Sequence, residues 1–392
     1  MSKSTIDAEE RVAEGGNGYE MSQQLRTKVV RMMKKKNYED AINELYKGSI
    51  RLLEQKEEGS GCDLAEYMLQ VYKEANLTVN DKTRERLENI LHRTVDDIWR
   101  KRLIAAAVKW TIHASGNPLG DAKLRLYIAE MLAENKLYYD AEANFLAACA
   151  QDKAGVRKFA AMINEWNDAY ASAVAEADKK KPSVDSVERV IVGKFAMRGW
   201  VPLLAAMAPE AASEFLHEFT SVFVKRNPTA LLSSVKPNPR DYVSPDKSSK
   251  HHAKVFVTAN PTLNLGQEAV ELACDASKLT PVPSAVKKAW QDTVQKLTKD
   301  GDNSSLDSIV EASLAQISAS TFQLTPPPRQ VDMVSSMFSS LMGGGAPGPD
   351  ANKKPVVKQL PKPDNPEESA ADDTAGEGQV SEAAKLADNE MD

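Results

Sequence analysis

The spacing of the apolar residues constrains the fold of this chain more than any other feature. From Leu25 to Phe322 these residues recur at helical rather than alternating intervals. The clearest run marks one face of one helix: Tyr38, Ala41, Ile42, Leu45, Tyr46, Ser49, Leu52 and Leu53. Further helices are expected over residues 64–75, 80–94, 98–112, 121–135, 138–150, 155–175, 184–197, 209–226, 263–276, 284–299 and 306–322. The pattern predicts an all-α protein.

One motif occurs twice at a distance that fits a helical repeat. Residues 38–41 read Tyr-Glu-Asp-Ala with Leu45 following, and residues 138–141 read Tyr-Tyr-Asp-Ala with Phe145 following, an offset of 100 residues. Three tetratricopeptide-length units of about 34 residues fill this distance, and Ala followed four residues later by Phe belongs to their packing pattern. The small Ala lets two helices approach, so each hairpin packs on the next. We therefore expect a right-handed α-solenoid of tetratricopeptide-like helix hairpins.

Prolines interrupt the helical pattern between residues 228 and 261. Pro237, Pro239 and Pro245, together with Asn and Ser, exclude a helix, and Ala-Lys-Val-Phe-Val-Thr at 253–258 is typical of a strand. We expect a β-hairpin or extended arm here. One face of such an arm can pack on the solenoid, whereas the other stays exposed unless a partner covers it.

These boundaries predict five parts of the chain. They are a disordered N-terminus at 1–18, the N-terminal half of the solenoid at 19–150, its C-terminal half with the arm at 151–325, an amphipathic segment at 326–342, and an acidic disordered tail at 343–392. The amphipathic segment either folds back on the solenoid or binds a partner. The tail holds 11 acidic and 5 basic residues, which accounts for the net charge of -6. The remainder is neutral overall, so nucleic acid is not an expected partner.

Side-chain patterns that would indicate catalysis or a bound cofactor do not occur in the sequence. There is no G-x-x-x-x-G-K-[ST] motif. The pair His217-Glu218 could begin the H-E-x-x-H motif of a zinc protease, but Ser221 stands where the second histidine is needed. His251 and His252 stand side by side without acidic or thiol neighbours in the sequence, and we interpret them as a solvated pair rather than a metal site. Cys62 is followed by an acidic residue, which disfavours a nucleophilic thiolate. We expect no enzyme activity, no cofactor and no metal.

The composition places the chain in the cytosol or nucleus. The longest uncharged apolar stretch, residues 201–208, is far shorter than the roughly 20 residues that cross a bilayer. The first 18 residues are polar and lack the apolar core of a signal peptide. The three cysteines are widely separated, so we expect reduced thiols. Because no apolar stretch is long enough to cross a bilayer, we expect no direct membrane insertion.

A collinear set of short segments resembles the scaffold subunit of the guided-entry-of-tail-anchored-proteins pathway, its factor 4 family. These segments are Tyr19-Glu20, 24–27, 37–41, 59–64, Lys109-Trp110, Gly120-Asp121, 138–145, 261–265, 328–330, Met337-Phe338 and 341–344. The resemblance implies a non-catalytic α-solenoid whose N-terminal half docks a targeting ATPase. It also implies that the C-terminal half, with its β-hairpin, binds a ubiquitin-like-domain co-chaperone. Such a scaffold serves the post-translational insertion of tail-anchored proteins into the ER membrane.

The resemblance also implies two sets of binding residues. The ATPase-binding set is Arg26, Arg31, Lys34, Lys35 and Asp63. The set for the ubiquitin-like partner is Val255, Phe256, Val257, Leu263 and Leu265.

Simpler interpretations of these residues stand beside the functional ones. The basic residues can form a solvated face, and Asp63 can cap a helix that starts at residue 64, with Glu66 closing a capping box. A BAG-domain chaperone is left open as a further partner. A generic helical-repeat scaffold of another cytosolic complex, in protein degradation or vesicle trafficking, is the alternative function.

Overall fold

The structure is a computed structural model that describes residues 18–299 and 308–324. All of these residues belong to one compact unit. The expectations for the N-terminal disorder before Gly18, the amphipathic segment at 326–342 and the acidic tail at 343–392 lie outside the described residues.

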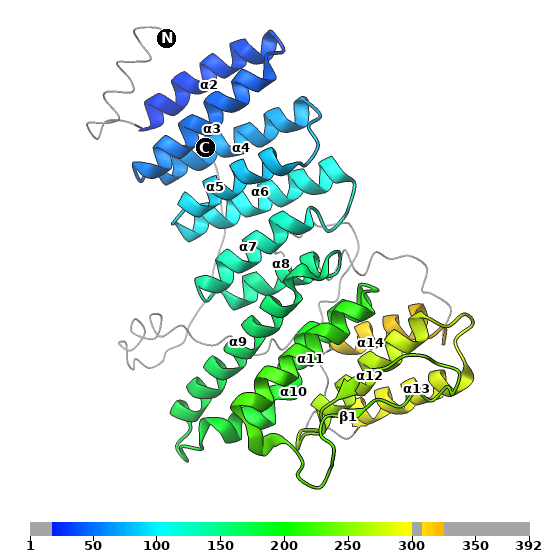
Figure 1. Cartoon of the computed structure of the whole chain (residues 1–392). Coiled ribbons are helices and arrows are strands. Elements are labelled where there is room, and N and C mark those ends of the chain that lie inside the picture. The colour runs from blue at the N-terminus through cyan, green and yellow to red at the C-terminus, as the bar shows by residue number, and fades with distance from the viewer. Residues whose placement is uncertain (1–17, 300–307, 325–392) are drawn as a thin grey trace, which may run out of the picture. The chain divides into compact units, whose positions relative to one another are not determined.

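The N-terminal part is a stack of helices that pair with their neighbours in the sequence (Figure 1). The helices are α2 (Gly18–Lys34), α3 (Tyr38–Glu54), α4 (Glu58–Glu74), α5 (Asp81–Arg93), α6 (Asp97–Ser115), α7 (Ala122–Glu134) and α8 (Tyr138–Cys149). Consecutive helices form hairpins, most extensively α3 with α4 and α7 with α8. In addition α2, α4 and α6 contact one another in turn, as do α3, α5 and α7. This two-layered stacking confirms the α-solenoid.

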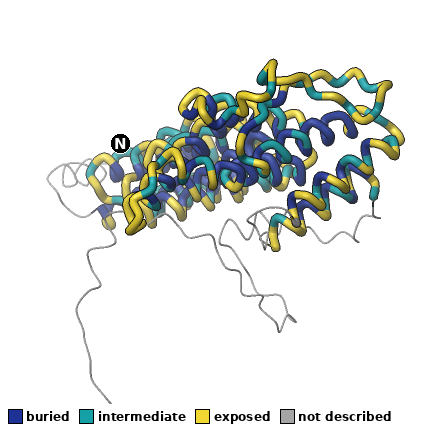
Figure 2. The backbone as a smooth tube through the Cα atoms, turned by 90° about the horizontal axis from the view of Figure 1, so that it is seen from below, coloured by how far each residue is buried: buried dark blue, intermediate teal, exposed yellow. Residues whose placement is uncertain are grey.

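The C-terminal part continues the stack with longer helices and an arm. Its elements are η1 (Lys153–Gly155), α9 (Val156–Ala177), α10 (Val184–Ala205), α11 (Pro209–Arg226), η2 (Pro228–Ala230), β1 (Arg240–Asp241), β2 (Lys254–Val255), α12 (Pro261–Ser277), α13 (Ser284–Lys299) and α14 (Ser308–Ser320). Helix α10 extends beyond the expected end at residue 197 and contains Pro202 four residues before its C-cap. Buried residues line the inside of the stack and exposed residues its outside (Figure 2).

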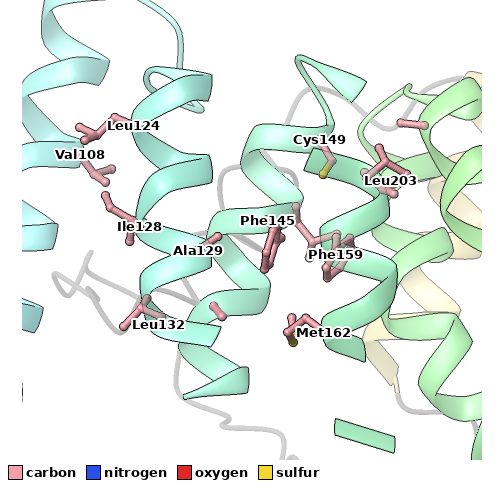
Figure 3. Close-up of a cluster of buried hydrophobic side chains, with 14 of the residues drawn as sticks. Val108, Leu124, Ile128, Ala129, Leu132, Phe145, Cys149, Phe159, Met162 and Leu203 are labelled. Atoms are coloured by element: carbon pink, nitrogen blue, oxygen red, sulfur yellow. The ribbon is translucent and has the colours of Figure 1, made fainter. Parts of the chain in front are cut away.

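The hydrophobic core is continuous across the middle of the chain. Phe145 of α8 stacks on Phe159 of α9 with ring centroids 5.4 Å apart, and Phe159 lies 4.8 Å from Phe215 of α11. Figure 3 shows Phe145 and Phe159 side by side, with aliphatic side chains of α6 and α7 extending the same core. The two parts of the solenoid therefore share one core at this position.

The repeated motif occupies equivalent buried positions. Ala41, Leu45 and Ala141 are fully buried and Phe145 is 1% exposed. The ring of Tyr138 stacks on Trp166 at 5.8 Å. The Ala and the large residue four positions later therefore pack in the core, as the repeat pattern predicts.

Helix α4 begins at Glu58, so the expectation that Asp63 caps it is wrong. Asp63 lies in the second turn, and no side-chain capping bond forms at the observed N-cap, Glu57. Glycines are needed in the first turn because neighbouring side chains occupy the space where a Cβ would stand. At Gly61 a Cβ would lie 2.8 Å from Cγ of Leu53. Gly61 therefore serves close contact between α3 and α4, and Gly59 close contact with Trp99 of α6, rather than a turn.

The arm contains a shorter hairpin than the strand pattern predicts. Arg240 pairs with Val255 and Asp241 with Lys254 in an antiparallel register, and a separate bridge joins Leu231 to Thr258. Between these pairings, side-chain amides bind the backbone of Phe256 and Val257, and the Val257 carbonyl also accepts from the Leu232 N–H at 3.0 Å. The arm is confirmed, and its regular strands are two residues long.

Candidate functional site

The C-terminal end of α2 is a basic cluster. Arg31 and Lys34 are in the last turn of the helix, and Lys35 follows it. All three are exposed, and within residues 18–299 and 308–324 no acidic side chain forms an ion pair with them. Cations at this position interact favourably with the helix dipole, by about 0.3–1 kcal/mol each. The helix dipole therefore favours these cations, whose side chains are exposed.

Two members of the expected ATPase-binding set lie elsewhere on the same side of the solenoid. The guanidinium carbon of Arg26 lies 5.4 Å from the centre of the Tyr67 ring on α4. Asp63 is one turn before Tyr67 on that helix. Arg26 precedes Lys34 by eight residues of α2, which is about 12 Å along the helix. Arg26 thus contacts the helix that carries Asp63, and it lies about two turns before Lys34 on α2.

Asp63 belongs to a charged network that links α4 to α6. Nη2 of Arg102 lies 3.1 Å from Asp63, and its Nε lies 2.6 Å from a carboxylate oxygen of Glu66. The Arg102 guanidinium also lies 5.2 Å from the centre of the Trp99 ring. The hydrogen bond to Glu66 raises the pKa of Arg102. Two carboxylates thus share one cation, so this patch is acidic rather than basic.

Exposed apolar residues next to this network were missed by the sequence analysis. Val95 is 74% exposed and Ile98 is 75% exposed, on either side of the α6 N-cap residue Asp96. The backbone amide of Val95 donates to Glu58 at 3.2 Å, which places the pair beside the start of α4. In the sequence these two apolar residues flank the acidic start of a helix, and this position indicates that their side chains can be exposed.

The arm is docked on the solenoid, which changes the interpretation of the second binding set. Val255 is 5% exposed and Leu263 is fully buried, so neither lies on a surface. Phe256, Val257 and Leu265 are half-buried, and Phe256 and Leu265 pack on the edge of the core. The expectation was that one face of the arm packs on the solenoid. Val255 lies on that face, so its place in the partner-binding set is wrong, because the hairpin turns its side chain inward.

Side-chain amides fix the arm in this position. The Gln267 amide accepts from the Phe256 N–H and donates to the Phe256 carbonyl, both at 2.9 Å. The Asn238 amide binds the N–H and carbonyl of Val257 in the same way, at 3.0 and 2.9 Å. The Phe256 ring lies 5.8 Å from the His217 ring of α11. Phe256 is thus held at the border between the core and the surface.

A groove of about 620 Å³ lies between the arm, α11 and α12. Charged residues from these three elements and Lys153 line most of it. His251, on its wall, is not a solvated side chain as expected from the sequence. Its side chain is 10% exposed, and its Nε2 lies 2.6 Å from a carboxylate oxygen of Glu271. The acidic neighbour comes from α12, 20 residues away in the sequence.

The buried thiols of Cys62 and Cys149 have raised pKa values, whereas a nucleophilic cysteine has a lowered one. Burial raises the pKa of Cys62 to about 12, although a hydrogen bond with Thr94 opposes the shift. Burial and then the charge of Asp152 raise the pKa of Cys149 to about 12. A reactive cysteine needs a lowered pKa, so neither residue is suited to nucleophilic catalysis.

The stacked hairpins and the docked arm define the class of helical-repeat proteins. Sequence comparison identifies which one. The profile of the Golgi to ER traffic protein 4 family matches residues 35–342, so the chain belongs to this family.

Individual relatives agree with this assignment. Golgi to ER traffic protein 4 of Schizosaccharomyces pombe is 33% identical over 145 residues, 36% of this chain and 47% of that protein. The homologue from Dictyostelium discoideum is 22% identical over 219 residues, 56% of this chain and 64% of that protein. The homologue from Oryzias latipes is 26% identical over 144 residues, 35% of this chain and 44% of that protein. The chain thus spans about half the length of the curated relatives it matches.

A solved structure shares the fold. The crystal structure of C. therm. Get4 superposes with a TM-score of 0.63 at 21% identity, and covers 90% of this chain and 98% of the other. In the part of the chain that the structure describes, no helix has both the length and the apolar character of a membrane span.

Proposed function

We propose that this chain is a non-catalytic scaffold of the cytosol that links a targeting ATPase to a ubiquitin-like-domain co-chaperone. The link serves the post-translational insertion of tail-anchored proteins into the ER membrane. The observation that carries the proposal is the family match over residues 35–342, since this range begins directly after α2 and includes the α4–α6 network and the docked arm.

The ATPase contact is assigned to the N-terminal surface. The exposed cluster of Arg31, Lys34 and Lys35 supplies positive charge that no described acidic residue neutralises. We assign Arg26 and Asp63, on α2 and α4, to a second contact area together with the exposed Val95 and Ile98. Opposite charges across an interface accelerate association, while apolar contacts at its centre slow dissociation.

The contact with the ubiquitin-like partner is assigned to the arm. Phe256, Val257 and Leu265 each keep part of their surface exposed. Val255 and Leu263 support them from below, because both are buried. The docked arm thus offers a preformed apolar edge, which lowers the entropic cost of binding.

Charge reversal tests the ATPase contact. The variant Lys34→Glu/Lys35→Glu/Lys36→Glu is expected to associate with the ATPase about tenfold more slowly at low salt and to lose the salt dependence of association. The chain provides a matched control in Lys179→Glu/Lys180→Glu/Lys181→Glu, a second exposed triplet that lies after α9. Association kinetics measured by surface plasmon resonance distinguish the two variants. Equal kinetics for both variants would place the contact away from α2.

The alternative, a scaffold of another cytosolic complex, is tested by the identity of captured proteins. Recovery of an arsenite-pump-like ATPase together with a ubiquitin-like protein from a cytosolic extract supports the proposal. Their absence from the captured proteins, with the bait folded, contradicts it.

A further inference from the structure

Three side chains with metal-ligating atoms meet beside the groove. His251 comes from the arm, and Glu271 and Cys274 lie one turn apart on α12. The ligating nitrogen, oxygen and sulfur atoms all lie within 4.8 Å of one another. The His251 and Glu271 side chains are 10% and 7% exposed, and Cys274 is 2% exposed. They are therefore shielded by the protein and border a groove that water can enter.

Neighbouring groups orient these side chains. The Ser213 hydroxyl donates to Oε1 of Glu271 at 2.7 Å, which leaves Oε2 toward His251. The Tyr242 ring packs edge-on against the His251 ring at 5.7 Å. The Tyr242 hydroxyl is itself buried and has no hydrogen-bond partner among the described residues. Such outer contacts fix ligand orientation in metal sites.

The local charge is suited to a cation. Besides Glu271, the carboxylate of Asp275 lies one turn further along α12 and is occupied by the hydroxyls of Ser244 and Ser249. The nearest opposing group is the Lys278 ammonium, whose Nζ lies 3.3 Å from Nδ1 of His251. An ammonium can only donate, so Nδ1 accepts and Nε2 donates its proton to Glu271 in this state. Lys278 is exposed, so its side chain has room to turn away.

We propose that His251, Glu271 and Cys274 form a zinc-binding site, with a water molecule from the groove as fourth ligand. One imidazole nitrogen, one carboxylate oxygen and one thiolate match the ligands that Zn²⁺ prefers in tetrahedral sites. Binding through Nε2 leaves the remaining imidazole proton on Nδ1. The Cys274 thiol donates to the Pro209 carbonyl at 3.2 Å without the ion, so this hydrogen bond breaks on binding and the proton passes to water in the groove. Because Nδ1 then donates, Lys278 must leave His251. The ion fastens the arm to α12.

Cobalt(II) titration of the full chain, followed by displacement with zinc, tests the site. We expect one cobalt per chain and a thiolate-to-cobalt charge-transfer absorption in the near ultraviolet. Cys274→Ser is expected to abolish that absorption, and Cys149→Ser, which changes another buried thiol, to retain it. His251→Asn is expected to weaken zinc binding at least about tenfold. The matched control is His252→Asn, which changes the exposed neighbour on the same groove wall.

A substitution that strengthens binding makes the test sharper. Lys278→Met removes the competing ammonium and is expected to tighten zinc binding several-fold. If Cys274→Ser does not fold, the zinc affinities of His251→Asn and Lys278→Met test the site, because both variants change residues outside the fully buried core. The proposal is overturned if no charge-transfer band forms, if His251→Asn binds zinc as tightly as His252→Asn, or if Lys278→Met leaves the affinity unchanged.

Discussion

The thiols of Cys62 and Cys149 make the stability of the fold depend on pH. Burial raises the pKa of each from 9.0 to about 12. Between these values the folded chain keeps protons that the unfolded chain has released. The free energy of unfolding therefore falls as pH rises through this window, and the thiols have no such effect below pH 9.

We expect this effect to reach about 1 kcal/mol per thiol at pH 10. Urea unfolding at pH 8 and pH 10 measures it, with the Cys62→Ala/Cys149→Ala variant as comparison. The variant should lose less stability between the two pH values than the parent chain, because alanine does not ionise. An equal loss in both proteins would mean that other groups cause the pH dependence.

At the scale of single elements, the start of α4 shows two effects of opposite sign. Glycine inside a helix is less favourable than alanine by about 0.8–1 kcal/mol. At Gly61, however, a Cβ would lie 2.8 Å from Cγ of Leu53 and 3.3 Å from its backbone nitrogen. Because a backbone atom is among these contacts, α3 and α4 must move apart to accommodate a Cβ at position 61.

Gly61→Ala is therefore expected to destabilise the protein by about 1–3 kcal/mol, since overpacking outweighs helix propensity. Thermal unfolding measures the change, and Ser60→Ala in the same turn is the control. A Gly61→Ala protein that melts at a higher temperature than the parent would show that propensity dominates and that the helices are not closely packed here.

The helices could be predicted from the sequence where their signals are local. Asn80 and Asp121 cap α5 and α7 at the expected boundaries, because a cap and an apolar stripe both lie within one segment. The start of α4 could not be predicted, because Gly-Ser-Gly is typical of a turn and its helical role depends on Leu53 of another helix. Long-range contacts at the two proposed binding surfaces could not be predicted for the same reason. Arg102 reaches Asp63 from 39 residues away, and Gln267 holds the arm through its side chain.

The arm is the element on which the second binding contact depends. We expect Phe256→Asp to keep the helical circular dichroism of the parent, because Phe256 lies at the border of the core. Binding of the ubiquitin-like partner should weaken by at least about 1.5 kcal/mol, about tenfold, which is the contribution of one buried Phe. Isothermal titration calorimetry measures the affinity.

The control for this substitution is Val243→Asp, which changes a residue of the same arm that is 83% exposed. Loss of helical signal in Phe256→Asp would identify Phe256 as a core residue. Normal binding by Phe256→Asp would move the contact elsewhere, for example to Leu265 on α12.

At the scale of the whole described unit, one continuous core carries both proposed contacts. The aromatic stack from Phe145 through Phe159 to Phe215 joins α8, α9 and α11 without a break. The basic cluster of α2 belongs to the first described helix, and the arm follows α11. Two partners can therefore bind to separate surfaces of one scaffold, and we expect little coupling between them.

The most direct test of this account is the composition of the complex formed by the chain with both partners present. Analytical ultracentrifugation should show one assembly that contains the chain, the targeting ATPase and the ubiquitin-like protein. The Lys34→Glu/Lys35→Glu/Lys36→Glu variant should lose only the ATPase, and Phe256→Asp should lose only the ubiquitin-like protein. Mutual exclusion of the two partners, or loss of both partners by either folded variant, would contradict the proposed scaffold function.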